Sequence, residues 1–196
     1  MAKKILQKEA PVLRKISESV PLETISMPKI QGIIKEMREA LDSQDDGVAI
    51  AAPQIGYPLR IFVVSKKVRN IIKESKNKTP VVSEQSENNE KDKAQAMTDI
   101  VFINPIIKKE SKKREVVEEG CLSVRFLYGK VSRASKATVE AYDEHGKKFS
   151  IGGTGLMAQI FQHETDHLNG ILFIDKAKFV EEILPEHLIP TKHKNG

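Results

Sequence analysis

The chain has 196 residues, of which 39% are hydrophobic and 30% charged, and its formal net charge is +5. This composition is ordinary for a cytoplasmic protein and predicts one globular domain, residues 1–196, with a substantial core. The chain has no tryptophan and only 5% aromatic residues. This argues against a protein that stacks nucleic-acid bases on aromatic side chains, and we expect no DNA partner.

The N-terminal part predicts an entry segment followed by an amphipathic helix. Residues 12–22 are expected to be extended or irregular. Ser26 can cap a helix that has Pro28 in its first turn, and apolar residues recur at helical spacing as far as Leu41. Asp-Asp-Gly at residues 45–47 breaks this helix. We interpret it as a structural packing element.

Two strands are expected on either side of a polar insertion. Apolar and β-branched runs predict strands at residues 59–65 and 100–104. The insertion between them, at about 66–99, is rich in Lys, Glu, Ser, Asn and Gln and has few apolar residues to anchor it. It is too long for an ordinary connection, so we expect a mobile surface loop.

Two β-hairpins are expected next. The first pairs residues 106–109 with 114–118 around a lysine-rich tip, which we interpret as solvated, with a binding patch as the alternative. The second pairs residues 131–142 with 147–151 through a turn at 143–146.

Cys121 is the only cysteine and lies in the sequence Glu-Gly-Cys-Leu-Ser, residues 119–123. A single cysteine excludes an intramolecular disulfide, and the absence of a long apolar run predicts a cytoplasmic protein without a membrane segment. A lone cysteine is usually a small buried hydrophobe. Here Gly120 permits close backbone approach and Glu119 suits an apolar core poorly, which favours a metal-binding thiolate instead.

His163 and His167 belong to an HExxH sequence on a predicted buried helix. Residues four apart lie on one helix face, so both imidazoles can bind the same metal ion. Thr154 is the expected N-cap and Gly170 the expected stop. Glu164 lies close enough to act on a water at the metal without being a ligand. HExxH alone also occurs by chance in helices that bind no metal.

A thiolate and two imidazoles leave one tetrahedral position open, which is typical of catalytic metal sites. These donor types by themselves suit zinc. After the HExxH helix, residues 173–176 are expected to close the core, and residues 179–184 to form a brief helix. The predicted fold class is α+β, with antiparallel β-sheets surrounding a central metal-binding HExxH helix and an N-terminal amphipathic helix.

Three blocks of the sequence resemble the motifs of the peptide deformylase family, in the same order. They are Gly-Val-Ala-Ile-Ala-Ala-Pro-Gln at residues 47–54, Glu-Gly-Cys-Leu-Ser at 119–123, and Gln-His-Glu-Thr-Asp-His at 162–167. The family has a second glycine where this chain has Ala49, whose methyl would narrow the channel for the substrate backbone or shift it slightly. It commonly has proline where this chain has Arg125, whose basic side chain is placed to meet the nascent peptide.

The resemblance implies a metal-dependent hydrolase that removes the N-formyl group from the N-terminal methionine of newly synthesised polypeptides. It implies one divalent metal ion bound by Cys121, His163 and His167. The implied natural metal is Fe(II), with zinc, nickel or cobalt as substitutes.

The resemblance also implies roles for three further residues. Glu164 would be the general base for attack by a metal-bound water and would then protonate the leaving amine. The Gln54 side-chain amide and the backbone N–H of Leu122 would stabilise the oxyanion.

Methionine has an unbranched thioether side chain, and its natural complement is an apolar pocket beside the metal. The candidate substrate-binding residues are Gly47, Val48, Ala49, Gly120, Leu122, Ile160 and His163. For Ile160, ordinary core packing is an equally good interpretation.

Glu119 is expected to order the metal ligands from behind, paired with Arg133, a basic position in the family after the second motif. The alternative is that Glu119 faces solvent. The basic surface would suit an enzyme that visits the ribosome transiently, since ribosomal RNA is anionic.

Two rival functions use the same features. A zincin-type metalloprotease shares HExxH but generally takes a third His or Glu, rather than a Cys within Glu-Gly-Cys-Leu-Ser. A non-catalytic protein that retains the fold would be expected to lose the base or a ligand, and the sequence retains all of them.

Overall fold

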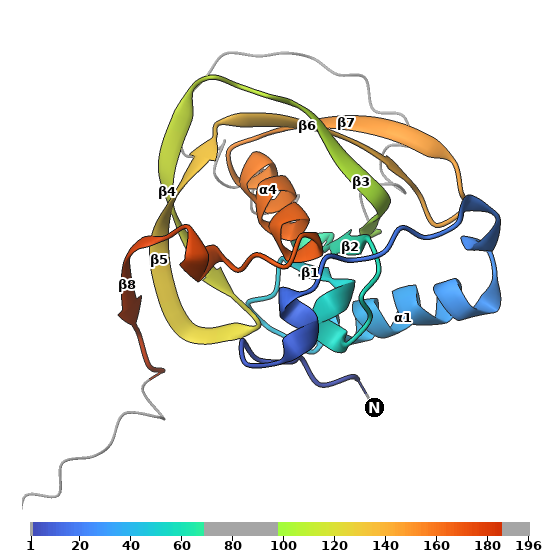
Figure 1. Cartoon of the computed structure of the whole chain (residues 1–196), viewed down its shortest axis with the longest axis horizontal. Coiled ribbons are helices and arrows are strands. Elements are labelled where there is room, and N and C mark those ends of the chain that lie inside the picture. Colours follow the sequence, from blue (N-terminus) through green and yellow to red (C-terminus); the bar gives the residue numbers. More distant parts are fainter. Residues whose placement is uncertain (1, 69–97, 186–196) are drawn as a thin grey trace, which may run out of the picture.

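The structure is a computed structural model that describes residues 2–68 and 98–185 (Figure 1). Its helices are α1 (Pro28–Asp42) and α4 (Leu156–Leu168), with short 3-10 turns at Pro11–Arg14, Leu22–Thr24, Ala52–Ile55 and Phe173–Asp175. Its strands are β1 (Ala49–Ala51), β2 (Ile61–Val64), β3 (Ile100–Glu110), β4 (Arg114–Cys121), β5 (Val124–Ala134), β6 (Lys136–Tyr142), β7 (Lys148–Thr154) and β8 (Lys178–Glu182).

The described strands form two antiparallel sheets. One contains five strands in the order β1-β2-β3-β6-β7, and the other contains three in the order β4-β5-β8. Figure 1 shows α4 in the middle of the molecule with strands of both sheets around it, and α1 to one side. The predicted α+β class with antiparallel sheets is therefore confirmed.

The five-stranded sheet is buried on both faces near its β1-β2 edge. Along β2, Ile61 and Val63 pack with the apolar face of α1, whereas Phe62 and Val64 pack with α4. This follows from the strand period of two, which sends successive side chains to opposite faces. The sheet therefore holds the two helices on opposite faces and fixes where α4 lies.

Aromatic packing anchors α4 against this sheet. The Phe62 and Phe102 rings are stacked with centroids 4.4 Å apart, and the Phe161 ring of α4 meets Phe102 edge-on at 5.5 Å. Such pairs contribute about 0.5–1.5 kcal/mol beyond the apolar area that they bury. The helix that contains His163 and His167 is thus fixed by its apolar face.

Both predicted helix caps are wrong. Helix α1 begins at Pro28 with Met27 as N-cap and no side-chain cap, because Pro28 at the first helical position already has a helical φ. Thr154 remains in β7, paired with Lys136, and Gly155 is the N-cap of α4. Gly170 does follow the end of α4, with φ at +73°, where an added Cβ would lie 2.7 Å from the Arg14 carbonyl oxygen.

Three strand and helix predictions are also wrong. The predicted hairpin of 106–109 with 114–118 does not form, because β3 pairs with β6 and β4 pairs with β5. The predicted strand 131–142 is divided at Ser135 between the two sheets. The predicted helix at 179–184 is instead β8, because pairing with β5 stabilises this short segment more than one isolated helical turn would.

Of the predicted polar insertion at about 66–99, residues 69–97 lie outside the described residues. At its edges, the Lys66 backbone N–H donates to Asp99 Oδ1 at 3.0 Å, and Val68 is fully buried. Within the part of the chain that the structure describes, neither helix has the length and hydrophobicity needed to cross a bilayer.

Candidate active site

Three side chains that can bind a metal ion meet where strand β4 reaches helix α4. Cys121 is the last residue of β4, and His163 and His167 lie one turn apart on α4. One potential ligand atom of each lies within 4.8 Å of the other two, and Cys121 Sγ is 3.2 Å from His167 Nε2. The structure therefore brings together the three residues that the sequence suggested as ligands.

This donor set fits a divalent metal ion. A thiolate and two imidazoles suit borderline-soft metals and leave a fourth position for water or substrate. His163 Nδ1 is 3.0 Å from Glu119 Oε2, which leaves its Nε2 available for a metal. The pKa values of the two imidazoles shift in opposite directions. Burial lowers the pKa of His167 well below its ordinary value, whereas the pKa of His163 is raised, against the effect of its own burial, by contacts with Cys121 and Glu119. A metal ion that binds His163 therefore has to displace a proton from it.

Glu119 is buried behind the ligands, with 1% of its side chain exposed. Arg133 donates to both of its carboxylate oxygens, from Nε at 2.7 Å and from Nη2 at 2.9 Å. Burial alone would raise the pKa of Glu119, but the hydrogen bonds from Arg133 and His163 lower it to about 2. The carboxylate is thus charged and orients the His163 ring.

Asp166 extends this ionic network, and its role was missed from the sequence. Arg133 Nη1 donates to Asp166 Oδ2 at 2.6 Å, and Lys176 Nζ lies 2.6 Å from Asp166 Oδ1. Two carboxylates and two cations therefore balance one another beside α4. The available signal was the position of Asp166 within HExxH, one residue before a ligand.

Glu164 is 4% exposed, and its Oε2 has no hydrogen-bond partner among the described residues. Burial raises the pKa of Glu164 to about 7. A buried carboxyl with a free oxygen is costly unless water or substrate supplies a partner, and such groups cluster at functional sites. Glu164 can therefore both accept and release a proton near neutral pH.

The Gln54 side chain is held in one orientation near Cys121. Its Oε1 accepts from the Ala51 backbone N–H at 2.8 Å, which turns its Nε2 away from β1. That Nε2 donates to Ser123 Oγ at 3.1 Å and lies 3.6 Å from Cys121 Sγ. Gln54 thus presents N–H donors beside the metal ligands.

Leu122 lies in the tight turn that joins β4 to β5. The register of these strands shifts after Gly120, so that Cys121 is opposite Val124. The Ser123 backbone N–H points to Cys121 Sγ at 3.4 Å, and Gln7 Nε2 donates to the Leu122 carbonyl at 3.1 Å. The turn that contains Leu122 is therefore fixed from both sides.

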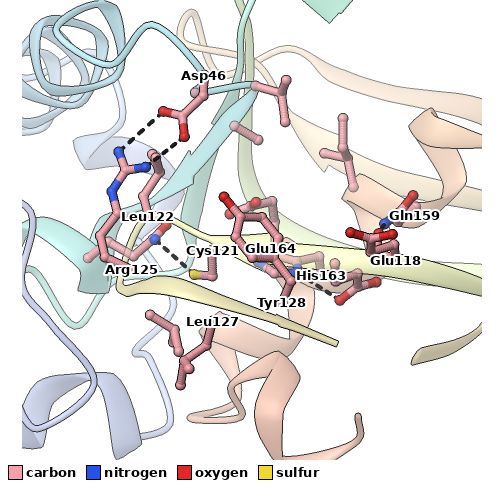
Figure 2. A pocket seen from close by; sticks show the side chains of 18 of the residues that line it. Asp46, Glu118, Cys121, Leu122, Arg125, Leu127, Tyr128, Gln159, His163 and Glu164 are labelled. Carbon is pink, nitrogen blue, oxygen red and sulfur yellow. Dashed lines mark hydrogen bonds and ion pairs between the residues drawn. The ribbon is translucent and has the colours of Figure 1, made fainter. Parts of the chain in front are cut away.

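A cavity of about 300 Å³ opens onto these groups. Figure 2 shows Cys121, His163 and Glu164 together in the middle of this pocket. Its lining includes the expected residues Gly47, Val48, Ala49, Gln54, Glu119, Gly120, Leu122 and Ile160. Arg133 and His167 do not line it, because both are almost completely buried, Arg133 against the Glu119 carboxylate.

Several lining residues were missed from the sequence. They are Asp46, Glu118, Val124, Phe126, Leu127, Tyr128, Leu156 and Gln159. Tyr128 is opposite Gly120 in the β4–β5 ladder, and a Cβ on Gly120 would lie 2.8 Å from its ring. The β4–β5 pairing could have suggested Tyr128, but the sequence predicted a different partner for β4.

Comparison with known proteins connects this site to one family. The polypeptide deformylase family model matches residues 2–182. A peptide deformylase from Dehalococcoides mccartyi is 37% identical over 192 residues, which cover 96% of this chain and 95% of the relative. A peptide deformylase from Rhizobium meliloti is 38% identical over 165 residues, which cover 84% of this chain and 79% of the relative.

Solved structures agree with the sequence comparison. A peptide deformylase from Legionella pneumophila has a TM-score of 0.68 at 36% identity, covering 91% of this chain and 87% of that one. A peptide deformylase from Thermotoga maritima has a TM-score of 0.70 at 28% identity, covering 91% of this chain and 99% of that one. Family model, sequence relatives and fold coincide over almost the whole chain, and on these grounds the protein belongs to the peptide deformylase family.

Proposed function

We propose that Cys121, His163 and His167 hold the metal ion with which this peptide deformylase removes the N-formyl group from the N-terminal methionine of nascent polypeptides. The observation that supports this is the meeting of the three ligand atoms, within 4.8 Å of one another, beside a pocket that also contains Glu164. The activity is that of a hydrolase that splits the formyl amide into formate and a free amine.

When bound, the metal supplies Lewis acidity, which polarises the formyl carbonyl and lowers the pKa of a water molecule. The proposed natural metal is Fe(II), on the resemblance of the three motifs to the family. Zinc, nickel and cobalt are the proposed substitutes, because nitrogen and sulfur ligands bind all of these ions.

Glu164 moves the proton in this mechanism. Its free Oε2 accepts a proton from the attacking water and then delivers it to the nitrogen of the leaving amine. A pKa raised by burial to about 7 suits both steps, because the group can exist in either form near neutral pH.

Gln54 and Leu122 stabilise the oxyanion that forms at the formyl oxygen. The Gln54 amide is already directed toward Cys121 by the bond between its Oε1 and Ala51 N–H. The Leu122 backbone N–H belongs to the turn that Gln7 and Ser123 fix. Donors fixed before the reaction stabilise developing charge without reorganising.

The substrate occupies the pocket between β1 and the start of β5. Val48, Leu122 and Ile160 provide apolar walls for the methionine side chain, and Gly47, Ala49 and Gly120 flank the peptide backbone. Residues 1–196 act as one catalytic domain in the cytoplasm. The net charge of +5 favours transient contact with anionic ribosomal RNA.

The test is formate release from formyl-Met-Ala-Ser by purified protein loaded with Fe(II) or nickel, with metal content measured on the same sample. We expect His163→Ala to lose metal and turnover together, whereas the exposed His145→Ala retains both. Cleavage of an internal peptide bond without formate release would instead identify a metalloprotease. Stoichiometric metal in both Cys121→Ala and His163→Ala would refute the assigned ligands.

A further inference from the structure

An ion pair joins the two rims of the substrate pocket. Arg125, at the start of β5, donates from Nη1 to Asp46 Oδ2 at 2.6 Å and from Nη2 to Asp46 Oδ1 at 3.2 Å. Its Nη2 also donates to Gln44 Oε1 at 2.6 Å. We call Arg125, Asp46 and Gln44 the clasp. Figure 2 shows its ion pair on one side of the pocket, away from Glu118 and Gln159.

The clasp differs from an ordinary surface ion pair in what its ends are attached to. Both Arg125 and Asp46 line the pocket. Asp46 immediately precedes Gly47–Ala49, one wall of the pocket, and Arg125 follows the turn that contains Leu122 on the opposite wall. A planar guanidinium bound in this forked geometry holds both distance and orientation.

Each end of the clasp is fixed to its own rim. On the β5 side, the Arg125 backbone N–H donates to Gln7 Oε1 at 3.3 Å, and Gln7 also bonds the Leu122 carbonyl. The next residue, Phe126, has a φ of +67°, and its carbonyl accepts from Ile183 N–H at 2.8 Å. A left-handed phenylalanine costs about 1–2 kcal/mol, so the surrounding contacts must impose this backbone.

On the β1 side, Gln44 closes a turn that leads to the pocket wall. Its carbonyl accepts from Gly47 N–H at 3.3 Å and from Lys67 Nζ at 3.2 Å. The hydrogen bond from Arg125 lowers the pKa of Asp46, against the opposing effect of its partial burial, so the carboxylate is charged at neutral pH.

The position of the clasp indicates which part of a substrate it affects. β1 is an edge strand of the five-stranded sheet, with the Gln54 amide and Cys121 near its C-terminal side. Proceeding away from these groups along the edge leads through Ala49 and Gly47 to Asp46. A peptide whose formyl group lies at the metal ligands reaches the clasp only with the residues after methionine.

We propose that the Arg125–Asp46 clasp is a positioning device that fixes the spacing of the two rims for the peptide residues following formyl-methionine. This inference rests on the proposed function, because it concerns the binding of the same substrate. The clasp touches no reacting atom. Breaking it should therefore weaken the binding of longer substrates and leave the chemical step unchanged.

The test compares Arg125→Ala, Asp46→Ala and the double variant on formyl-Met-Ala-Ser and on formyl-methionine amide. We expect KM for the longer substrate to rise about two- to fivefold in all three, as for loss of one partly exposed pair, with kcat within about twofold. The double variant should resemble the singles, because either change breaks the same contact. KM for formyl-methionine amide should remain unchanged.

Two control variants test whether a change in KM is specific to the clasp. Arg38→Ala removes an arginine of similar exposure, 31% against 29%, whose 2.7 Å pair with Glu144 lies outside the pocket, and it should change neither KM. Exchanging the charges, with Arg125→Asp and Asp46→Arg together, should recover part of the lost binding. Unfolding temperatures of all variants show whether each is folded.

The outcomes are distinguishable from failure of the proposed function. Absence of formate release by the unmutated protein would refute the function itself. Active variants with an unchanged KM for formyl-Met-Ala-Ser, or with equal changes in KM for both substrates, would refute the positioning role of the clasp and leave the proposed function intact. An effect of Arg125→Ala that Asp46→Ala does not share would also refute it, because Arg125 would then contact the peptide directly.

Discussion

At the scale of single residues, Glu119 connects the candidate metal site to the interior of the protein. Its carboxylate accepts from Arg133 at 2.7 Å and 2.9 Å and lies 3.0 Å from His163 Nδ1. Arg133 is 4% exposed on its side chain, so its charge depends on buried carboxylates for compensation. One residue therefore affects both the orientation of a ligand and the stability of the fold.

Replacing Glu119 with alanine should lower both the stability of the fold and the affinity for the metal. Arg133 would retain only Asp166, and breaking a buried ion pair from one side costs about 3–5 kcal/mol of unfolding free energy. The His163 ring would lose its orienting partner, and metal affinity should fall about 10- to 100-fold. Denaturant unfolding and competition with a chelator measure the two effects.

Glu115→Ala is the matched control on the same strand. Glu115 pairs with Lys113 at 2.8 Å, but its side chain is 46% exposed. This change should alter unfolding free energy by less than about 1 kcal/mol and leave metal affinity unchanged. Equal effects of the two substitutions would show that Glu119 has no special role.

The sequence was most informative about residues whose spacing is local. His163 and His167 are four residues apart, and Cys121 lies in a distinctive motif, so their meeting in one candidate metal site could be predicted. Asp166 and the partnership of Arg125 with Asp46 could not. The contacts of Asp166 depend on how α4 lies against β5, and the Arg125–Asp46 pair depends on how β5 meets the segment before β1. Charge alone does not specify a partner.

At the scale of secondary structure, the approach of β7 to α4 requires a small residue. A Cβ added to Gly153 would lie 2.7 Å from Met157 Cγ and 2.9 Å from Phe161 Cε2. Met157 and Phe161 belong to the buried face of α4. The absence of a side chain at Gly153 thus lets the sheet lie against the helix that contains both histidines.

Gly153→Ala should therefore destabilise the protein by about 1–3 kcal/mol, because the added methyl overpacks the contact between β7 and α4. Gly152→Ala is a close control on the same strand, since its Cβ would meet only Thr138 Oγ1 at 3.8 Å. We expect the control to be neutral or slightly stabilising in thermal and denaturant unfolding. The same loss of stability at both positions would contradict overpacking at α4.

Strand existence was predicted better than strand pairing. Apolar and β-branched runs marked β2 and the start of β3, but such runs do not identify a partner strand. The Lys-rich link between β3 and β4 resembles a hairpin tip locally, whereas it actually passes from one sheet to the other. Likewise, β8 pairs with residues far earlier in the sequence, so its conformation is set by β5 rather than by its own helical spacing.

At the scale of the whole molecule, the candidate metal site joins two separately paired parts of the chain. Cys121 belongs to the three-stranded sheet, and His163 and His167 belong to the helix packed on the five-stranded sheet. A metal bound to all three links these parts. Because the ligand set is assembled only in the folded chain, metal binding should stabilise the native state.

Removing the metal should consequently lower the unfolding temperature. At a free metal concentration 100-fold above Kd, binding adds about 2.7 kcal/mol, which corresponds to roughly 5–10 °C for a chain of this size. Calorimetry with and without a chelator measures the shift. Cys121→Ala should show a much smaller shift, and an equally large shift in this variant would mean that the stabilising metal binds elsewhere.

Metal binding and proton transfer are assigned to different residues of one site. Metal content and formate release measured together on Glu164→Ala test this division most directly. We expect about one metal ion per chain, as in the unmutated protein, with kcat reduced roughly 10²- to 10⁴-fold, because only proton transfer is removed. Near-normal turnover by the metal-loaded variant, or loss of its metal, would contradict the assignment.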